Sequence, residues 1–195
     1  MATTLFAQTP EEIIARMDKE TDRFDKEGFS MVMEIKMPII GAVSTTVYTF
    51  GNKYKMILNV KDKGAITWTD RTTDWVYDES KNEVTISATK ASKESEADSN
   101  KKMLDSVTDG YDVQLKEETD TAWYFRCTKS KTNTKKDDPK AMDLVVSKST
   151  YLPISLKSTL RGVTVTLRDF AIGVSEDDVT FDASKYPTAK IIDKR

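Results

Sequence analysis

The sequence contains no histidine and only one cysteine, Cys127, among its 195 residues. Without histidine, the chain cannot form a Ser-His-Asp or Cys-His catalytic group, use imidazole as a general base or bind a metal through imidazole. A single cysteine excludes an intramolecular disulfide and a thiolate-cluster metal site. These absences argue against most classes of enzyme, and they favour a binding or structural protein that uses no cofactor.

The chain also lacks a strong charge of either sign and any long hydrophobic run. Thirty Lys and Arg residues stand against 32 Asp and Glu residues, which gives a net charge of −2. A nearly neutral chain lacks the basic surface of a nucleic-acid-binding protein. No apolar run approaches the ~18 residues of a transmembrane helix. Apolar residues make up 38 % of the chain, which is enough for one hydrophobic core.

The first residues are small and apolar up to Ala7, and Gln8 follows. This pattern is typical of the end of a secretory signal, with cleavage after Ala7. The alternative is an ordinary disordered N-terminus. We therefore expect residues 1–7 to be a signal-peptide remnant and residues 8–195 to form a single domain. Because Cys127 lies deep in the chain, no cysteine is placed to carry a lipid anchor at a mature N-terminus.

An amphipathic helix is predicted directly after this segment. Thr9 can act as its N-cap, Pro10 suits the first helical position, and Glu12 completes a capping box. Apolar residues then recur at near-helical spacing up to Phe24. The spacing predicts a helix of about four turns that ends before Gly28.

From Phe29 to Phe170 the apolar residues mostly alternate with polar ones, which is typical of half-buried β-strands. We count eleven strand candidates, and a short helix is expected near 97–108. The tail 182–195 has the composition of turns. No alternation of strands with helices occurs, so we expect a mainly β fold with an antiparallel sheet. Its expected form is a strongly curved, incomplete β-barrel of about eleven strands, not closed on itself, with a helical lid.

Several stretches resemble the LolA lipoprotein carriers of the bacterial periplasm, in an order that spans nearly the whole chain. Thr73-Asp74-Trp75-Val76-Tyr77-Asp78 is similar to the "W-x-Y-x-P" stretch of that family, although the proline is absent. Residues 143–146 and 153–156 are similar to its late hairpin. Residues 172–182 and the pair Tyr186-Pro187 are similar to its C-terminal end.

This resemblance implies an unclosed antiparallel half-barrel whose apolar cavity holds the acyl chains of lipoproteins. It implies a soluble, monomeric periplasmic carrier without enzymatic activity, whose cargo is an acylated lipoprotein or a related lipid. An inner-membrane complex would release this cargo to the carrier, and an outer-membrane acceptor would receive it. Some family members hold the lid shut with an arginine on an early strand. Residues 43–52 contain no arginine here, so this latch is not expected.

The candidate cavity residues are apolar side chains in the inward phase of the predicted strands. They are Met31, Met33, Ile35, Met56, Leu58, Trp68, Trp75, Tyr77, Trp123, Phe125, Leu144 and Leu156. Methionine is flexible and suits surfaces that accept varied apolar ligands. Ordinary core packing is the alternative for every one of these residues. The candidate lid residues are Ile13, Ile14, Met17, Met103, Leu104 and Val107.

Two further alternatives remain open at this stage. The same half-barrel could serve a non-catalytic envelope sensor or interaction scaffold that binds a protein partner. The Lys-rich loop 129–140 is either a solvated hairpin tip or a surface that docks on anionic lipid or on an acidic partner. A pocket open to solvent would favour a carrier, whereas a filled core would favour a scaffold.

Overall fold

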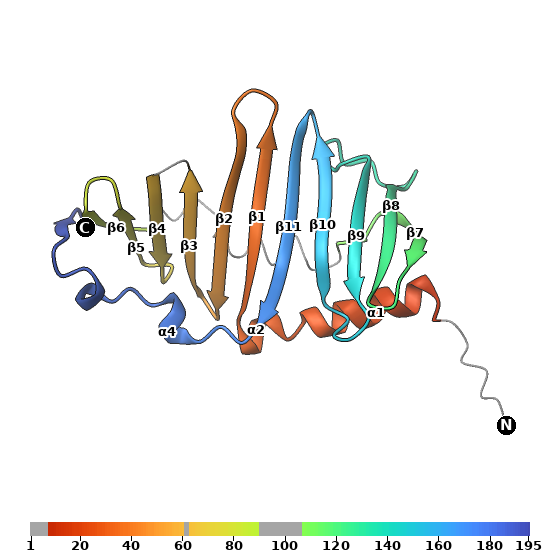
Figure 1. Ribbon diagram of the computed structural model, residues 1–195, viewed down its shortest axis with the longest axis horizontal. Coiled ribbons are helices and arrows are strands. Elements are labelled where there is room, and N and C mark those ends of the chain that lie inside the picture. The colour runs from red at the N-terminus through yellow and green to blue at the C-terminus, as the bar shows by residue number, and fades with distance from the viewer. Residues whose placement is uncertain (1–7, 61–62, 90–106) are drawn as a thin grey trace.

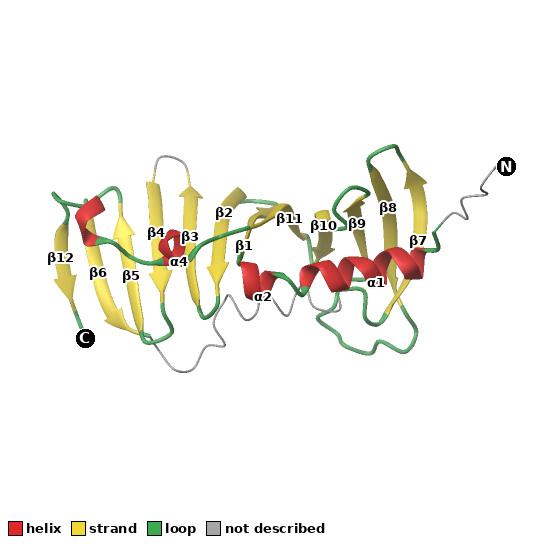
Figure 2. Cartoon of the chain, turned by 90° about the horizontal axis from the view of Figure 1, so that it is seen from below, coloured by secondary structure: helices red, strands yellow, loops and turns green. Residues whose placement is uncertain are grey.

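The computed structural model describes residues 8–60, 63–89 and 107–195. Its strands form one broad sheet, with the helices along one end of the strands (Figures 1 and 2). The elements are α1 (Pro10–Thr21), α2 (Phe24–Glu27), β1 (Phe29–Met37), β2 (Gly41–Phe50), β3 (Lys53–Val60), β4 (Lys63–Thr69), β5 (Thr73–Asp78), β6 (Glu83–Ala88), β7 (Tyr111–Glu118), β8 (Ala122–Lys129), β9 (Ala141–Ser147), β10 (Pro153–Leu160), β11 (Val163–Ile172), α4 (Glu176–Val179), a 3₁₀ helix (Ala183–Lys185) and β12 (Lys190–Asp193).

The sheet has twelve strands in the order β12-β6-β5-β4-β3-β2-β1-β11-β10-β9-β8-β7. Its two edge strands, β12 and β7, do not pair with each other, so the described strands do not close into a barrel. Every neighbouring pair is antiparallel except β12 and β6. The expected fold class, a mainly β half-barrel with an antiparallel sheet, is confirmed, and all eleven strand candidates are present.

Two hairpin turns show why the chain reverses where the sequence predicts. Gly51 has φ +56°, and Phe50 pairs directly with Lys53 across a two-residue turn. Arg161 and Gly162 both have positive φ, and Leu160 pairs with Val163. Two-residue turns of this kind match the twist of antiparallel strands.

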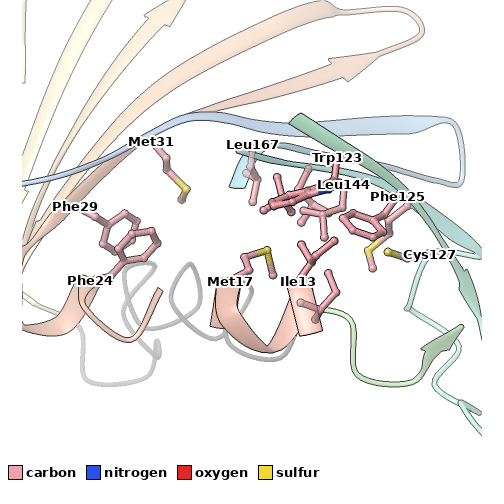
Figure 3. Close-up of a cluster of buried hydrophobic side chains, with 14 of the residues drawn as sticks. Ile13, Met17, Phe24, Phe29, Met31, Trp123, Phe125, Cys127, Leu144 and Leu167 are labelled. Atoms are coloured by element: carbon pink, nitrogen blue, oxygen red, sulfur yellow. The ribbon is translucent and has the colours of Figure 1, made fainter. Parts of the chain in front are cut away.

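The predicted N-terminal helix begins as expected but is divided into two. The capping box is formed, because the Glu12 amide donates to Thr9 Oγ1 (3.3 Å) and the Thr9 amide donates to Glu12 Oε2 (2.9 Å). The Thr21 hydroxyl donates to the carbonyl of Asp18 (2.8 Å), and α1 ends there. The expectation of one continuous helix up to Gly28 is therefore wrong. The break lets Phe24 of α2 stack on Phe29 of β1, with ring centroids 4.4 Å apart (Figure 3).

The tail also differs from the expectation of turns alone. Residues 190–193 form β12, which pairs with β6 in parallel. The chain reaches β6 from β11 in the middle of the sheet, through α4 and the 3₁₀ helix (Figure 1). Asn82 Nδ2 donates to the carbonyl of Thr188 (3.0 Å), and the amide of Lys194 donates to the carbonyl of Ile86 (2.8 Å). These bonds fix the tail on the edge of β6. The helix expected near 97–108 lies outside the described residues, apart from a turn at 107–108.

Candidate functional site

The pairing of the strands determines which predicted residues share a face. Met31 of β1 pairs with Val47 of β2, which pairs with Met56 of β3. In the other direction Met33 pairs with Leu167, and the same face continues through Leu156, Leu144 and Phe125, which pair in succession. We call this the inner face, because α1 packs against it. Ile35, Leu58 and Trp123 lie on it as well.

Beneath α1 the inner face is covered by closely packed side chains. Ile13 and Met17 point from α1 toward Leu144 and Phe125 on the sheet (Figure 3). Met31, Phe125 and Leu144 are almost fully buried in this cluster. A side chain closed in by protein on all sides has no surface left for a ligand. In this part of the inner face, the described side chains serve as core.

Trp68, Trp75 and Tyr77 lie on the opposite face, so the expectation that all twelve candidates form one wall is wrong. Trp68 pairs with Lys55 and Trp75, whereas Met56 pairs with Thr67. The C-terminal segment covers this outer face. Phe181 meets Trp68 edge-on (5.4 Å) and stacks on Trp75 (5.8 Å), and Tyr186 packs on Tyr77 (4.6 Å).

Because Phe181 lies at the centre of this aromatic cluster, we expect its removal to lower the stability of the protein. Phe181→Ala should lower the free energy of unfolding by about 2 kcal/mol, because Phe181 is half-buried and touches two tryptophan rings. Chemical denaturation followed by tryptophan fluorescence measures this change. Pro187→Ala, at an exposed position of the same segment, is the matched control. An unfolding free energy equal to that of the parent would show that the segment does not hold the outer face.

A cavity of about 520 Å³ lies beside the filled core, on the inner face of β9, β10 and β11. Its apolar wall consists of Met142, Leu156, Leu160, Val165 and Leu167, together with Val107. The volume falls in the range of about 300–1,000 Å³ that is typical of small-molecule sites. Exposed residues, among them Lys135 and Asp137, also line it, so the cavity reaches the surface. An apolar wall with a charged mouth suits an amphiphilic ligand.

Hydrogen bonds hold the mouth of the cavity in place. The Tyr111 hydroxyl donates to the carbonyl of Pro139 (3.0 Å), and Asn133 Nδ2 donates to Asp138 Oδ2 (2.8 Å). Burial raises the pKa of Tyr111 above its ordinary value, and the charge of Asp138 adds to this shift. The phenol therefore stays neutral at physiological pH and remains a hydrogen-bond donor. The Tyr111 bond joins β7 to the loop between β8 and β9, and the Asn133 bond lies within that loop.

Of the twelve candidate cavity residues, the structure places one, Leu156, in the wall of this cavity. Met33 and Met56 are half-buried and pack against the core cluster. Val107, a candidate lid residue, lines the cavity, whereas Met103 and Leu104 lie outside the described residues. Sequence reasoning missed Ser158 and Val165 as lining residues. The alternation on β10 could have identified Ser158, which shares the phase of Leu156.

Contacts around Tyr151, away from the cavity, hold α1 against the sheet. The guanidinium of Arg16 lies 4.0 Å from the centre of the Tyr151 ring, and the Tyr151 hydroxyl donates to Gln8 Oε1 (2.9 Å). Tyr151 in turn packs on Trp123, with ring centroids 5.2 Å apart. A cation over an aromatic face is attracted by the ring electrons. In the described part of the chain, these contacts tie the start of α1 to the segment between β9 and β10.

Other chemically reactive groups do not form a site in the described residues. Burial raises the pKa of the Cys127 thiol to about 11, so the thiol is neutral and packs as a small apolar group. Across residues 8–60, 63–89 and 107–195, no cluster of three His, Cys, Asp or Glu side chains could hold a metal ion. In the same ranges, no helix is both long enough and apolar enough to cross a membrane.

Comparison with known proteins shows which solved structures have a similar fold. No protein-family model matches the chain, and no curated protein matches it. LprF from Mycobacterium bovis is similar in structure with a TM-score of 0.52 and 10 % identity, over 87 % of this chain and 96 % of that one. An uncharacterized conserved protein from Thermus thermophilus reaches a TM-score of 0.47 and 15 % identity, over 96 % and 100 %. A LolA superfamily protein from Nitrosomonas europaea reaches 0.37 and 15 %, over 91 % and 100 %. The likeness to LprF shows a shared fold, and the unclosed, mainly antiparallel sheet that the sequence resemblance implies is confirmed.

Proposed function

We infer that the protein is a non-catalytic carrier that binds the acyl chains of lipoproteins or related lipids. The observation that carries this proposal is the cavity on the inner face of β9, β10 and β11. Leu156, Leu160 and Val165 give it an apolar wall, and Lys135 lies at its mouth. In the proposed complex the acyl chain enters the apolar part, and the polar end of the ligand stays among the charged groups of the mouth.

The energetics suit a ligand that must later be released. Burying a methylene group contributes about 0.8 kcal/mol, so a few buried methylenes suffice for binding. Because the core beneath α1 is closed, the ligand is held by the cavity alone and a longer chain remains partly exposed. Partial burial of this kind favours transfer to an acceptor over permanent retention.

The proposed setting is the periplasm, with transfer of the cargo toward the outer membrane. The small apolar residues before Gln8 support export, and the order of the LolA-like stretches supports a role in lipoprotein transport. In this setting a monomeric carrier receives its cargo from an inner-membrane complex and delivers it to an outer-membrane acceptor. The cargo is an acylated lipoprotein or a related lipid.

One observation favours a second candidate function, an envelope sensor or scaffold. The inner face beneath α1 is filled by Met17, Phe125 and Leu144, which is what a protein without a ligand requires. In that case the open cavity beside the core would be a surface for a protein partner. The two functions differ in whether an isolated acyl chain binds.

Binding of a fluorescent fatty-acid analogue, titrated into the full chain, tests the carrier proposal. Ser158→Phe should weaken binding roughly tenfold or more, because the ring would fill space that the ligand needs. Ser158 is half-buried and has a small side chain, so the substitution removes little native packing.

The matched control is Thr159→Phe, the next residue on β10, which is exposed on the outer face. This variant should bind the probe like the parent, and both variants should keep melting temperatures within a few degrees of the parent. If the parent binds no probe, or if both variants bind it equally, the carrier proposal fails and the scaffold is favoured.

A further inference from the structure

Two adjacent isoleucines stand at the tip of the β1–β2 hairpin without protein around them. Ile39 is 97 % exposed and Ile40 is 72 % exposed. The turn Pro38-Ile39-Ile40 joins two long strands whose ends pair at Met37 and Gly41. This hairpin projects above its neighbours at the end of the sheet away from α1 (Figure 1). The next most exposed large apolar residue of the described chain is Ile191, at 47 %.

The pairing directions bring two further features to the same end of the sheet. Because β1 and β11 are antiparallel, the β10–β11 turn lies beside the β1–β2 tip. A Cβ placed on Gly162 would lie 3.7 Å from Pro38 Cγ, so the two turns are in contact. The loop between β8 and β9 ends at the same level, and Arg161 Nη2 pairs with Asp137 Oδ1 of this loop (3.0 Å).

The charge around the apolar tip is mainly positive. Loop 129–140 carries five lysines against two aspartates, and Asp137 is paired with Arg161. The loop lysines that are exposed are Lys131, Lys135, Lys136 and Lys140. Lys36, close to the tip on β1, is exposed too. The acidic groups near loop 129–140 include Asp138, which accepts from Asn133, together with Asp109 and Asp112. Asp78 and Glu79 lie at the same end of the sheet but further from the loop, where β5 ends.

The mouth of the cavity opens at this same end. Leu160, the last residue of β10, lines the cavity together with Lys135 and Asp137 of loop 129–140. Arg161 follows Leu160 directly and touches Asp137. The apolar tip, the lysines and the cavity mouth therefore form one continuous end of the molecule.

We propose that this end of the sheet docks on an anionic lipid surface, with Ile39 and Ile40 inserted at the bilayer interface and the lysines of loop 129–140 on the lipid headgroups. Aliphatic side chains inserted beside a ring of cations are the arrangement by which proteins bind the membrane interface. A stable protein interface buries about 1,200–2,000 Å² in total. Two side chains on a narrow, projecting turn suit insertion into a lipid surface better than a contact of that size.

Docking in this orientation turns the cavity mouth toward the lipid. If the proposed carrier function holds, an acyl chain then moves between bilayer and cavity with a shorter path through water. The biological purpose of docking thus rests on the carrier function, but docking itself does not, because Ile39 and Ile40 do not line the cavity.

Vesicle flotation of the full chain tests the docking proposal. The parent should float with phosphatidylglycerol-containing vesicles and much less with pure phosphatidylcholine vesicles, and added salt should release it. The double variant Ile39→Ser with Ile40→Ser should lower the partition coefficient roughly tenfold or more. The control Ile154→Ser changes another exposed isoleucine, at the start of β10 and away from the tip, and it should float like the parent.

The outcomes separate this proposal from the carrier function. Titration of the fatty-acid analogue without vesicles should give the same affinity for the double variant as for the parent. A parent that does not float with anionic vesicles, or a double variant that floats unchanged, overturns docking whatever the probe shows. A parent that self-associates through the tip, with the double variant monomeric and neither floating, also overturns it and assigns the tip to a protein contact. If Ser158→Phe loses the probe but still floats, docking stands independently of the cavity.

Discussion

Gly28→Ala should lower the free energy of unfolding by about 3 kcal/mol or more, a large part of the stability of an ordinary domain. Gly28 joins α2 to β1 with φ +66°, a conformation that residues with a side chain rarely adopt. A Cβ at this position would lie 2.3 Å from the carbonyl oxygen of Val174 and 2.8 Å from that of Thr49. Both contacts are with backbone atoms, which cannot turn away as a flexible side chain could. Chemical denaturation of the parent and the variant measures the change.

Gly173→Ala is the matched control for this prediction. Gly173 also has positive φ, at +105°, but a Cβ there would meet no atom within 4 Å. The control therefore carries the backbone strain without the close contacts, and we expect a loss of about 1–2 kcal/mol. Equal losses for the two variants would show that the junction of α2, β2 and the C-terminal segment is not closely packed around Gly28.

Ile13→Asp should lower the free energy of unfolding by about 4 kcal/mol or more, because it removes a fully buried side chain and places an unpaired charge in the core. Ile13 is 0 % exposed, and its side chain points from α1 into the core residues of the sheet (Figure 3). Ala15→Asp is the control, because Ala15 is exposed on the same helix and its replacement by Asp loses at least as much helix propensity as that of Ile13. Thermal unfolding should show a large shift for the first variant and a small one for the second. Equal shifts would place α1 away from the sheet.

The strands and turns could be predicted from the sequence because they depend on local patterns. Alternation fixes which residues of one strand share a face, and it correctly groups Met31 with Met33 and Trp123 with Phe125. It does not fix how the faces of successive strands correspond, since that depends on the register. Between β3 and β4 the larger side chains change sides: Met56 lies on the inner face and Trp68 on the outer face. Both phases of β3 contain apolar residues, so no local pattern marks this change.

The cavity is harder to predict than the strands because it is the space that neighbouring side chains leave empty. Leu156 and Leu167 look alike as apolar strand residues, and nothing in their pattern says that an open volume lies beside them. The pattern does not identify Ser158, because a polar strand residue is expected to face outward, yet Ser158 lines the cavity in phase with Leu156. The aromatic residues of β4 and β5, which the pattern predicts as cavity residues, lie on the outer face instead. Their partners, Phe181 and Tyr186, lie about a hundred residues further along the chain, where no local pattern could reveal the contact.

Photo-crosslinking with a diazirine-labelled fatty acid tests the central claim most directly, because it shows where an acyl chain binds. The full chain is irradiated with the probe, digested and mapped by mass spectrometry. The carrier account predicts labels on β9, β10 and β11 at cavity residues such as Met142, Leu160 and Val165, and the loss of these labels in Ser158→Phe. Labels confined to the outer face around Trp75 and Phe181, or no saturable labelling at all, would contradict it.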